Sequence, residues 1–172
     1  MRRRSAITCL ATGSAGLLLA FVLPHAVAAD LECHLSIPAR VQMRAAIPLT
    51  FELVNRGKAT LNVLNWDTPL EGFFGQYLRI TGPAGEVDYR GPVVKRATPT
   101  REEYVSIKRG ARIKKTLNLA PGYDFKTAGR HEIAFTGKLV DATNAKIPRA
   151  HLQHTPMTID CPTVTFELAA AR

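Results

Sequence analysis

The stretch IPLTFELVNRGKATLNVLNW, residues 47–66, decides the fold class of this chain. Residues 47–54 alternate between apolar and polar side chains, which is the period of a strand that buries one face. The alternation stops at the NRGK turn signal of residues 55–58 and then resumes, with Leu61 and Val63 on one face. The stretch therefore predicts a strand, a turn and a second strand.

Short alternating segments recur along the rest of the chain, and no long helical period accompanies them. Roughly eight or nine strands in one domain of this size predict an all-β sandwich. Two capping-box patterns, at residues 68–71 and 100–103, predict single helical turns, and residues 141–155 predict a long loop. The predicted strands are residues 47–54, 60–66, 76–81, 86–90, 104–107, 111–119, 130–140, 157–159 and 164–168.

The first residues have the pattern of an export signal. Three arginines at positions 2–4 precede an apolar run at residues 15–23, and Ala-Val-Ala at 26–28 is a small-x-small cleavage site. The apolar run is short for a membrane span, which needs roughly 20 apolar residues. We therefore predict a signal peptide over residues 1–28, a single domain over residues 29–172, and a periplasmic or extracellular destination.

Two cysteines, Cys33 and Cys161, remain after the predicted cleavage, because Cys9 lies within the signal. An even pair in an exported protein favours a disulfide. Closing a loop of about 130 residues stabilises by an upper figure on the order of 4–5 kcal/mol through chain entropy. The alternative is a pair of free thiols or a metal pair.

Several motifs share their order and spacing with a known family. The most specific are TPLEG at residues 68–72 and YRGPVVKR at residues 89–96, within the longer stretch WDTPLEGFFGQYLRITGPAGEVDYRGPVVKR at residues 66–96. They resemble the N-terminal immunoglobulin-like sandwich region of secreted zinc proteases of the deuterolysin and peptidyl-lysine metalloendopeptidase type. This resemblance implies an immunoglobulin-like antiparallel β-sandwich of about 8 strands. It continues through Pro99, Tyr104, LNLAPGYDF at residues 117–125, and Gly129.

This sequence lacks the H-E-x-x-H motif with which that family binds its catalytic zinc. His131 and Glu132 are followed by Ile133, Ala134 and Phe135, so the second histidine of H-E-x-x-H is missing. A zinc protease needs both histidines on one helical face with the glutamate as base. In an alternating segment, His131 and Glu132 should point to opposite faces. We therefore predict a non-catalytic domain with no cofactor.

Other residues are candidates for a metal site. His151 and His154 lie three apart and could combine with His34 or Asp160. A loop does not fix the orientation of such a pair, so a solvated loop is the favoured interpretation.

The lead hypothesis is a secreted module that binds a protein partner, above all a protease, in an accessory, chaperone-like or inhibitory role. Adjacent aromatics in a connection can anchor a partner, although one of them could instead plug the end of the sandwich. The predicted contact residues are Phe73, Phe74, Tyr89, Arg90, Lys95, Arg96 and Arg101.

The alternative hypothesis is an adhesion module that binds anionic glycans through a basic face. The chain carries 23 Lys and Arg residues against 14 Asp and Glu residues, a net charge of +9. Such charge attracts anionic partners. A nucleic-acid partner is not expected, because export is predicted and no aromatic-basic binding motif is present. The basic residues concerned are Lys95, Arg96, Arg101, Lys108, Arg109, Arg112, Lys114 and Lys115.

Overall fold

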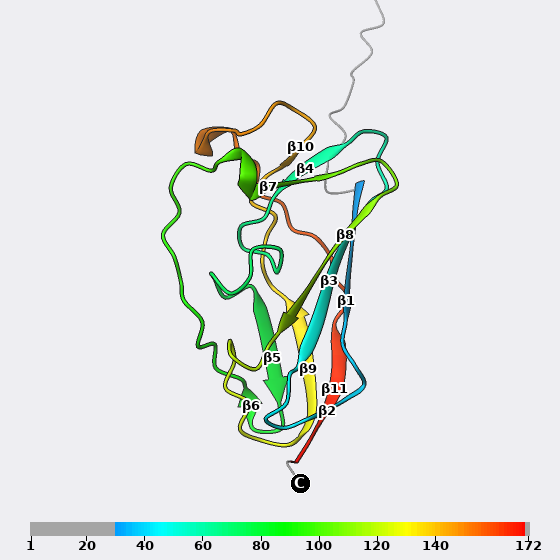
Figure 1. Ribbon diagram of the computed structural model, residues 1–172, viewed down its shortest axis with the longest axis vertical. Helices are drawn as coiled ribbons and strands as arrows, with labels where there is room; N and C mark the ends of the chain where they lie inside the picture. Colours follow the sequence, from blue (N-terminus) through cyan, green and yellow to red (C-terminus); the bar gives the residue numbers. More distant parts are fainter. Residues whose placement is uncertain (1–29, 171–172) are drawn as a thin grey trace, which may run out of the picture.

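The computed structural model describes residues 30–170, and the predicted signal peptide of residues 1–28 lies outside the described residues. The described part is an all-β sandwich, elongated in outline (Figure 1), which confirms the predicted fold class. The strands are β1 (Leu31–Ser36), β2 (Arg40–Gln42), β3 (Pro48–Asn55), β4 (Leu61–Leu64), β5 (Leu78–Gly82), β6 (Gly85–Glu86), β7 (Tyr104–Ile107), β8 (Arg112–Asn118), β9 (Gly129–Phe135), β10 (Ala142–Thr143) and β11 (Val164–Ala169). Two 3-10 turns, η2 (Arg101–Glu103) and η3 (His151–Gln153), accompany them.

The strands form three hydrogen-bonded sheets, with orders β1-β3-β8, β10-β4-β7 and β2-β11-β9-β5-β6. The first and third pack face to face, because Phe51 of β3 meets Phe135 of β9 with ring centroids 5.5 Å apart. Their inward side chains alternate with outward ones, as in the burial of Leu49, Phe51 and Leu53 along β3. Among the described residues, the paired strands are antiparallel except β11 and β2, which are parallel.

Asn55 joins two of the sheets. Its fully buried side chain donates to the carbonyls of Ala59 and Ile107, each at 2.8 Å, and accepts from the Gly57 N–H at 2.9 Å. An asparagine amide can satisfy several backbone groups in this way. The turn predicted at residues 55–58 therefore carries the chain from the β1-β3-β8 sheet into β4 of the next sheet.

Several predicted strands differ from the observed ones. The segment 130–140 stops at Phe135, because the N–H groups of Thr136 and Gly137 turn to the carbonyl of Tyr77 at 2.9 and 3.1 Å. The predicted strand 86–90 overlaps the two-residue β6 only at Glu86 and otherwise makes a single bridge from Tyr89 to Tyr123. The predicted strand 157–159 makes only a bridge between Leu139 and Met157. The predicted loop 141–155 contains β10 and η3.

The predicted disulfide between Cys33 and Cys161 is present in the structure. It links β1 to the residue three positions before β11, with Cα atoms 4.8 Å apart and a sequence separation of 128. Both cysteines are buried within the main hydrophobic cluster. The bond therefore ties the beginning of the described chain to its end.

Candidate partner-binding surface

A long connection between β6 and η2, residues 87–100, runs along the outside of the sandwich. Figure 1 shows it as an open green curve that passes from the lower end of the molecule towards the upper end without folding back. We call residues 87–100 the arch. Pro92 and Pro99 lack an N–H, and a residue that precedes proline favours the extended region, so Thr98 cannot easily continue a helix. The sequence therefore disfavours a helix at the end of the arch.

The lower end of the arch is fixed by Tyr89 and Arg90. The Arg90 N–H donates to the Gly122 carbonyl at 2.8 Å, and its guanidinium pairs with Asp124. The Tyr89 hydroxyl donates to the Pro92 carbonyl at 3.0 Å. The Tyr89 ring also packs edge-on against the Tyr123 ring, with centroids 5.3 Å apart. These contacts hold the chain where it leaves the sheet.

The upper end of the arch is fixed through Arg96. Its guanidinium pairs with the carboxylate of Glu71, and its Cζ lies 5.2 Å from the centroid of the Trp66 ring. The Trp66 Nε1–H in turn donates to Glu103 of η2 at 2.8 Å. A partly desolvated pair of this kind has a stronger cation–π attraction than an exposed one. A ring nitrogen of His151 bonds to the carbonyl of Ala97, next to Arg96.

The two glutamates in this group have pKa values shifted in opposite directions. Burial raises the pKa of Glu71 above its usual value, although the Asp67 N–H and Arg96 act in the other direction. Burial also acts on Glu103, but there the hydrogen bonds from Thr100 and Trp66 outweigh it and hold the pKa below its usual value. Glu71 reaches back as predicted for the turn at residues 68–71, but it accepts from the Asp67 N–H at 2.9 Å, one residue before the cap residue Thr68.

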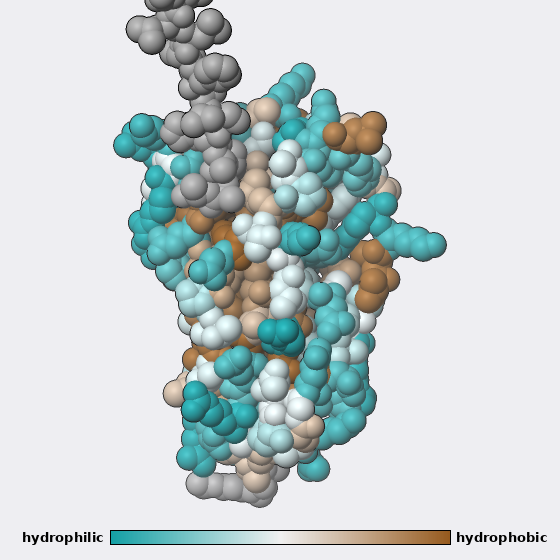
Figure 2. Space-filling view, turned by 180° about the vertical axis from the view of Figure 1, so that it is seen from behind, coloured by the Kyte–Doolittle hydropathy of each residue, from teal (hydrophilic) through white to brown (hydrophobic). Residues whose placement is uncertain are grey.

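An apolar spot lies on the arch between these anchors. Phe74 is 46% exposed, Val93 78% and Val94 37%, and the Val94 N–H approaches the Phe74 carbonyl at 3.4 Å. They are three of the four large hydrophobic residues exposed among the described residues, the fourth being Leu152. Figure 2, seen from behind, shows an apolar protrusion at mid-height on the right margin, the side on which that view carries the arch. Phe74, Val93, Val94 and the exposed Lys95 make a surface that we call the arch patch.

The predicted contact residues divide into exposed and internal ones. Phe74, Lys95 and Arg101 are exposed. Phe73 is half-buried against the core and meets the Tyr123 ring edge-on at 6.2 Å, so it plugs the sandwich. Tyr89 and Arg96 are partly buried and engaged within the protein as described above, whereas Arg90 is exposed although its guanidinium pairs with Asp124. The sequence interpretation did not single out Val93 and Val94, because valine pairs are ordinary in strands; their position between Pro92 and Pro99 was the available signal.

The candidate histidines have other partners within the protein: His151 and His154 bond to backbone carbonyls, and His34 lies 2.9 Å from the Glu32 carboxylate. His154 lies 3.1 Å from the Arg149 carbonyl through Nε2, and its ring meets that of His151 at 5.1 Å. His131 is buried in β9 whereas Glu132 is exposed, as the alternation predicts. Within residues 30–170, no group of three or more His, Cys, Asp or Glu side chains is arranged to hold a metal ion.

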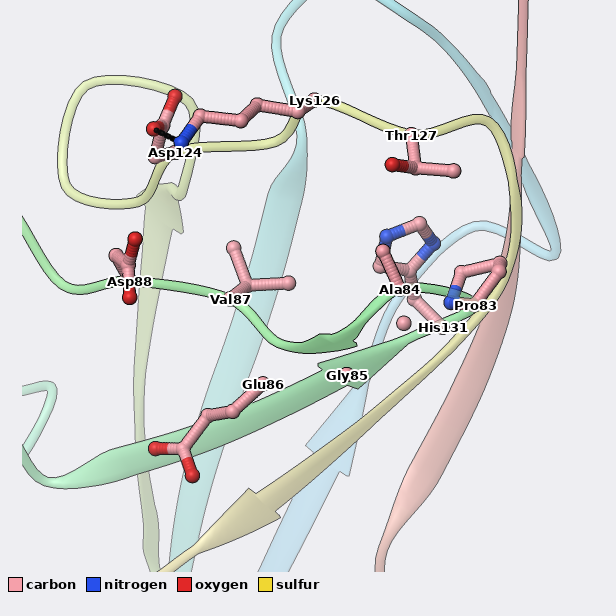
Figure 3. Close-up of a pocket in the computed structure, with 11 residues that line it drawn as sticks. Pro83, Ala84, Gly85, Glu86, Val87, Asp88, Asp124, Lys126, Thr127 and His131 are labelled. Carbon is pink, nitrogen blue, oxygen red and sulfur yellow. Dashed lines mark ion pairs between the residues drawn. The ribbon is translucent and has the colours of Figure 1, made fainter.

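A small pocket of about 180 Å³ lies beside His131, around the β5–β6 turn. Figure 3 shows Asp124 paired with Lys126 at its rim, while Asp88 and Glu86 point away from the histidine. Pockets for small ligands usually enclose about 300–1,000 Å³. The pocket is therefore smaller than a usual ligand site, and its rim charges are partly satisfied.

Part of the positive charge on the predicted basic face is neutralised by ion pairs with Glu52. Arg112 and Lys114 of β8 both pair with Glu52 of β3, at 3.2 and 3.0 Å. The hydrogen bond from Lys114 is the largest cause that holds the pKa of Glu52 below its usual value. Lys108, Arg109 and Lys115 are exposed nearby in the sequence.

Comparison with known proteins gives one partial similarity in sequence and weak ones in structure. No protein-family profile matches the chain. An extracellular protease from Aeromonas hydrophila is 28% identical over 120 residues, which cover 69% of this chain and 34% of the protease. The match therefore spans about a third of the length of that relative.

Solved structures with a related outline have low TM-scores. The CARDB domain of a Pyrococcus furiosus protein, in complex with di-metal ions, has 14% identity and a TM-score of 0.33, covering 83% of this chain and 88% of that one. An alkylpurine DNA glycosylase from Pseudomonas fluorescens, bound to DNA containing an abasic site analog, has 16% identity and a TM-score of 0.34, covering 82% and 31%. Scores this low carry no argument about function.

Two features are consistent with export: the disulfide and the similarity to an extracellular protease. Among the described residues, no helix is long and apolar enough to cross a membrane. The chain is therefore an all-β domain that is similar in sequence to part of an extracellular protease.

Proposed function

We propose that this chain is a non-catalytic module that binds an extracellular endopeptidase, in an accessory, chaperone-like or inhibitory role. The partial similarity to the Aeromonas hydrophila protease supports an association with proteolysis. The motifs at residues 68–72 and 89–96 refine the proposal towards the sandwich region of deuterolysin-type and peptidyl-lysine-type zinc proteases. No catalytic role is assigned, because His131 and Glu132 lie on opposite faces of β9 rather than on one face of a helix.

The observation that carries the proposal is the arch patch. Phe74, Val93 and Val94 each expose an apolar side chain, the Val94 N–H lies 3.4 Å from the Phe74 carbonyl, and exposed Lys95 follows in the chain. Exposed apolar groups that gather in one place, beside polar groups, mark protein-interaction sites more often than scattered ones do.

Binding to the purified Aeromonas hydrophila protease tests this proposal. The full exported chain is immobilised, and the dissociation constant is measured by surface plasmon resonance at moderate salt. We expect saturable one-to-one binding, and Phe74→Asp should weaken it by about tenfold or more, because a charge would be buried in an apolar contact. Leu152→Asp is the matched control, since Leu152 is a fully exposed large hydrophobic residue of η3 that is not part of the patch. No binding, or equal affinity of both variants, would contradict the proposal.

The second candidate is binding of anionic glycans, favoured by the exposed Lys108, Arg109 and Lys115. Exposed charge contacts are screened by salt. Retention on a heparin column that collapses between low and high salt, and that falls when Lys108 and Arg109 are changed to Glu, would favour this candidate. Retention that is unaffected by these changes would argue against it.

A further inference from the structure

We propose that the arch enters the substrate cleft of an endopeptidase as an extended, substrate-like strand, and that the cleft recognises the side chains of Val93 and Lys95. This inference rests on the proposed function and adds the mode of binding. It follows from the open backbone of the arch, the alternation of its side chains and the fixation of its two ends.

The backbone of the arch is open to a partner. Among the described residues, the N–H groups of Val93, Lys95 and Ala97 make no hydrogen bond to the rest of the protein, and the bond from Val94 to Phe74 is long at 3.4 Å. Figure 1 shows no strand drawn beside this segment on its outer side. Clefts that bind extended peptides gain affinity from such main-chain groups and specificity from pockets for alternate side chains.

The side chains of the arch alternate as they do in a strand. Val93 is 78% exposed and Lys95 is exposed, whereas Val94 is 37% exposed beside Phe74, and the Arg96 side chain is only 24% exposed between Glu71 and Trp66. In an extended chain, residues two apart lie on one face. Val93 and Lys95 are both exposed and share one side of the extended segment, whereas Arg96 faces the body of the domain. Val94 is itself still partly exposed, beside Phe74.

The two ends of the segment are held in place before any partner arrives. Tyr89 and Arg90 fix the lower end, and Arg96 fixes the upper end. Ordering a free loop on binding costs conformational entropy, which lowers the affinity. A segment that is already extended avoids part of this cost, so it competes well with a flexible peptide substrate.

The chemistry of the fitting cleft follows from the two outward side chains. The position that receives Val93 should be apolar, and the position that receives Lys95 should carry a carboxylate. A positive side chain facing such a group favours the correct partner and disfavours basic clefts. The occupant is thus an endopeptidase that accepts an aliphatic residue two positions before a lysine.

Competition with a peptide substrate tests the inference. The full exported chain is titrated into the Aeromonas hydrophila protease, and cleavage of a fluorogenic peptide containing Val-Val-Lys is followed. We expect competitive inhibition, with a rise of about tenfold or more in the inhibition constant for Val93→Asp and for Lys95→Glu. The matched controls are Leu152→Asp and Lys58→Glu, at exposed positions outside the arch, and these should stay within about twofold of the wild type.

The outcomes separate the inference from the proposed function. Binding without competition, or competition that both arch variants retain in full, would overturn the inference and leave the proposed module intact. Absence of binding in the resonance experiment would overturn both. Because Val93 and Lys95 are exposed, their variants should keep the thermal midpoint of the wild type, which separates lost contacts from lost folding.

Discussion

Glu103 is the residue on which the upper anchor of the arch depends. Its carboxylate accepts the Trp66 Nε1–H at 2.8 Å and the Thr100 N–H at 2.7 Å. Hydrogen bonds to a carboxylate favour its charged form, and here they outweigh burial, so the folded pKa lies below the ordinary value of 4.5. Such a group stabilises the fold above its unfolded pKa, and this stabilisation is lost as pH falls through the folded pKa.

Glu103→Gln should therefore lower the thermal midpoint at pH 7, and its difference from the wild type should be smaller at a pH well below 4.5, because this stabilisation is lost as the pH falls through the folded pKa. The measurement is thermal unfolding of both proteins at the two pH values. The other carboxyls with lowered pKa values, Glu32, Glu52 and Asp124, are present in both proteins and cancel in the comparison. A difference in thermal midpoint of the same size at both pH values would show that proton linkage at Glu103 does not contribute to stability.

At the scale of single residues, roles that depend on local spacing could be predicted from the sequence, whereas contacts between distant residues could not. The capping role of Glu71 and the opposite faces of His131 and Glu132 depend only on local spacing, which the sequence contains. The contact of Arg96 with Trp66 joins residues 30 positions apart across two connections, so only the folded chain defines it. The choice between Phe73 and Phe74 likewise depends on which ring meets Tyr123.

At the scale of elements, β10 and η3 show why residues 141–155 resisted prediction. β10 has only two residues, too few for a visible alternation. Asp141, just before it, is completely buried and accepts from the Tyr104 hydroxyl at 2.9 Å and from Arg149 at 2.7 Å. Burial and this bond to Asp141 raise the pKa of Tyr104 to about 12. The segment is ordered by one buried charge rather than by a periodic pattern.

Arg149→Leu should leave the buried carboxyl of Asp141 without its cationic partner. Breaking a buried pair in this way costs about 3–5 kcal/mol. Denaturant unfolding measures the loss, with exposed Arg130→Leu as the control, expected within about 0.5 kcal/mol of the wild type. The double variant Asp141→Asn, Arg149→Leu should recover part of the loss, because no buried charge remains. A double variant as unstable as Arg149→Leu alone would contradict the assignment.

At the scale of the whole molecule, the disulfide closes most of the described chain into one loop. Its sequence separation of 128 restricts the unfolded chain strongly. Changing Cys33 and Cys161 together to Ala should lower the free energy of unfolding by about 2–5 kcal/mol, as measured by denaturant titration. Reduced wild-type protein should show a similar loss. Equal midpoints for oxidised and reduced protein would exclude a stabilising role.

The all-β class and the sandwich were predictable because alternation and turn signals recur from residue 47 to residue 168. The three-sheet arrangement was not, since it depends on where Asn55 redirects the chain and on the parallel pairing of β2 with β11. Both depend on contacts between distant residues, which no local window contains.

The positions of the two cysteines have a consequence for the arch. Cys33 precedes residues 87–100 in the chain, and Cys161 follows them. If an enzyme cuts the arch, the two fragments remain covalently joined and the sandwich keeps both of its halves. The product would be a two-chain protein that migrates as one band without reductant and as two bands with it.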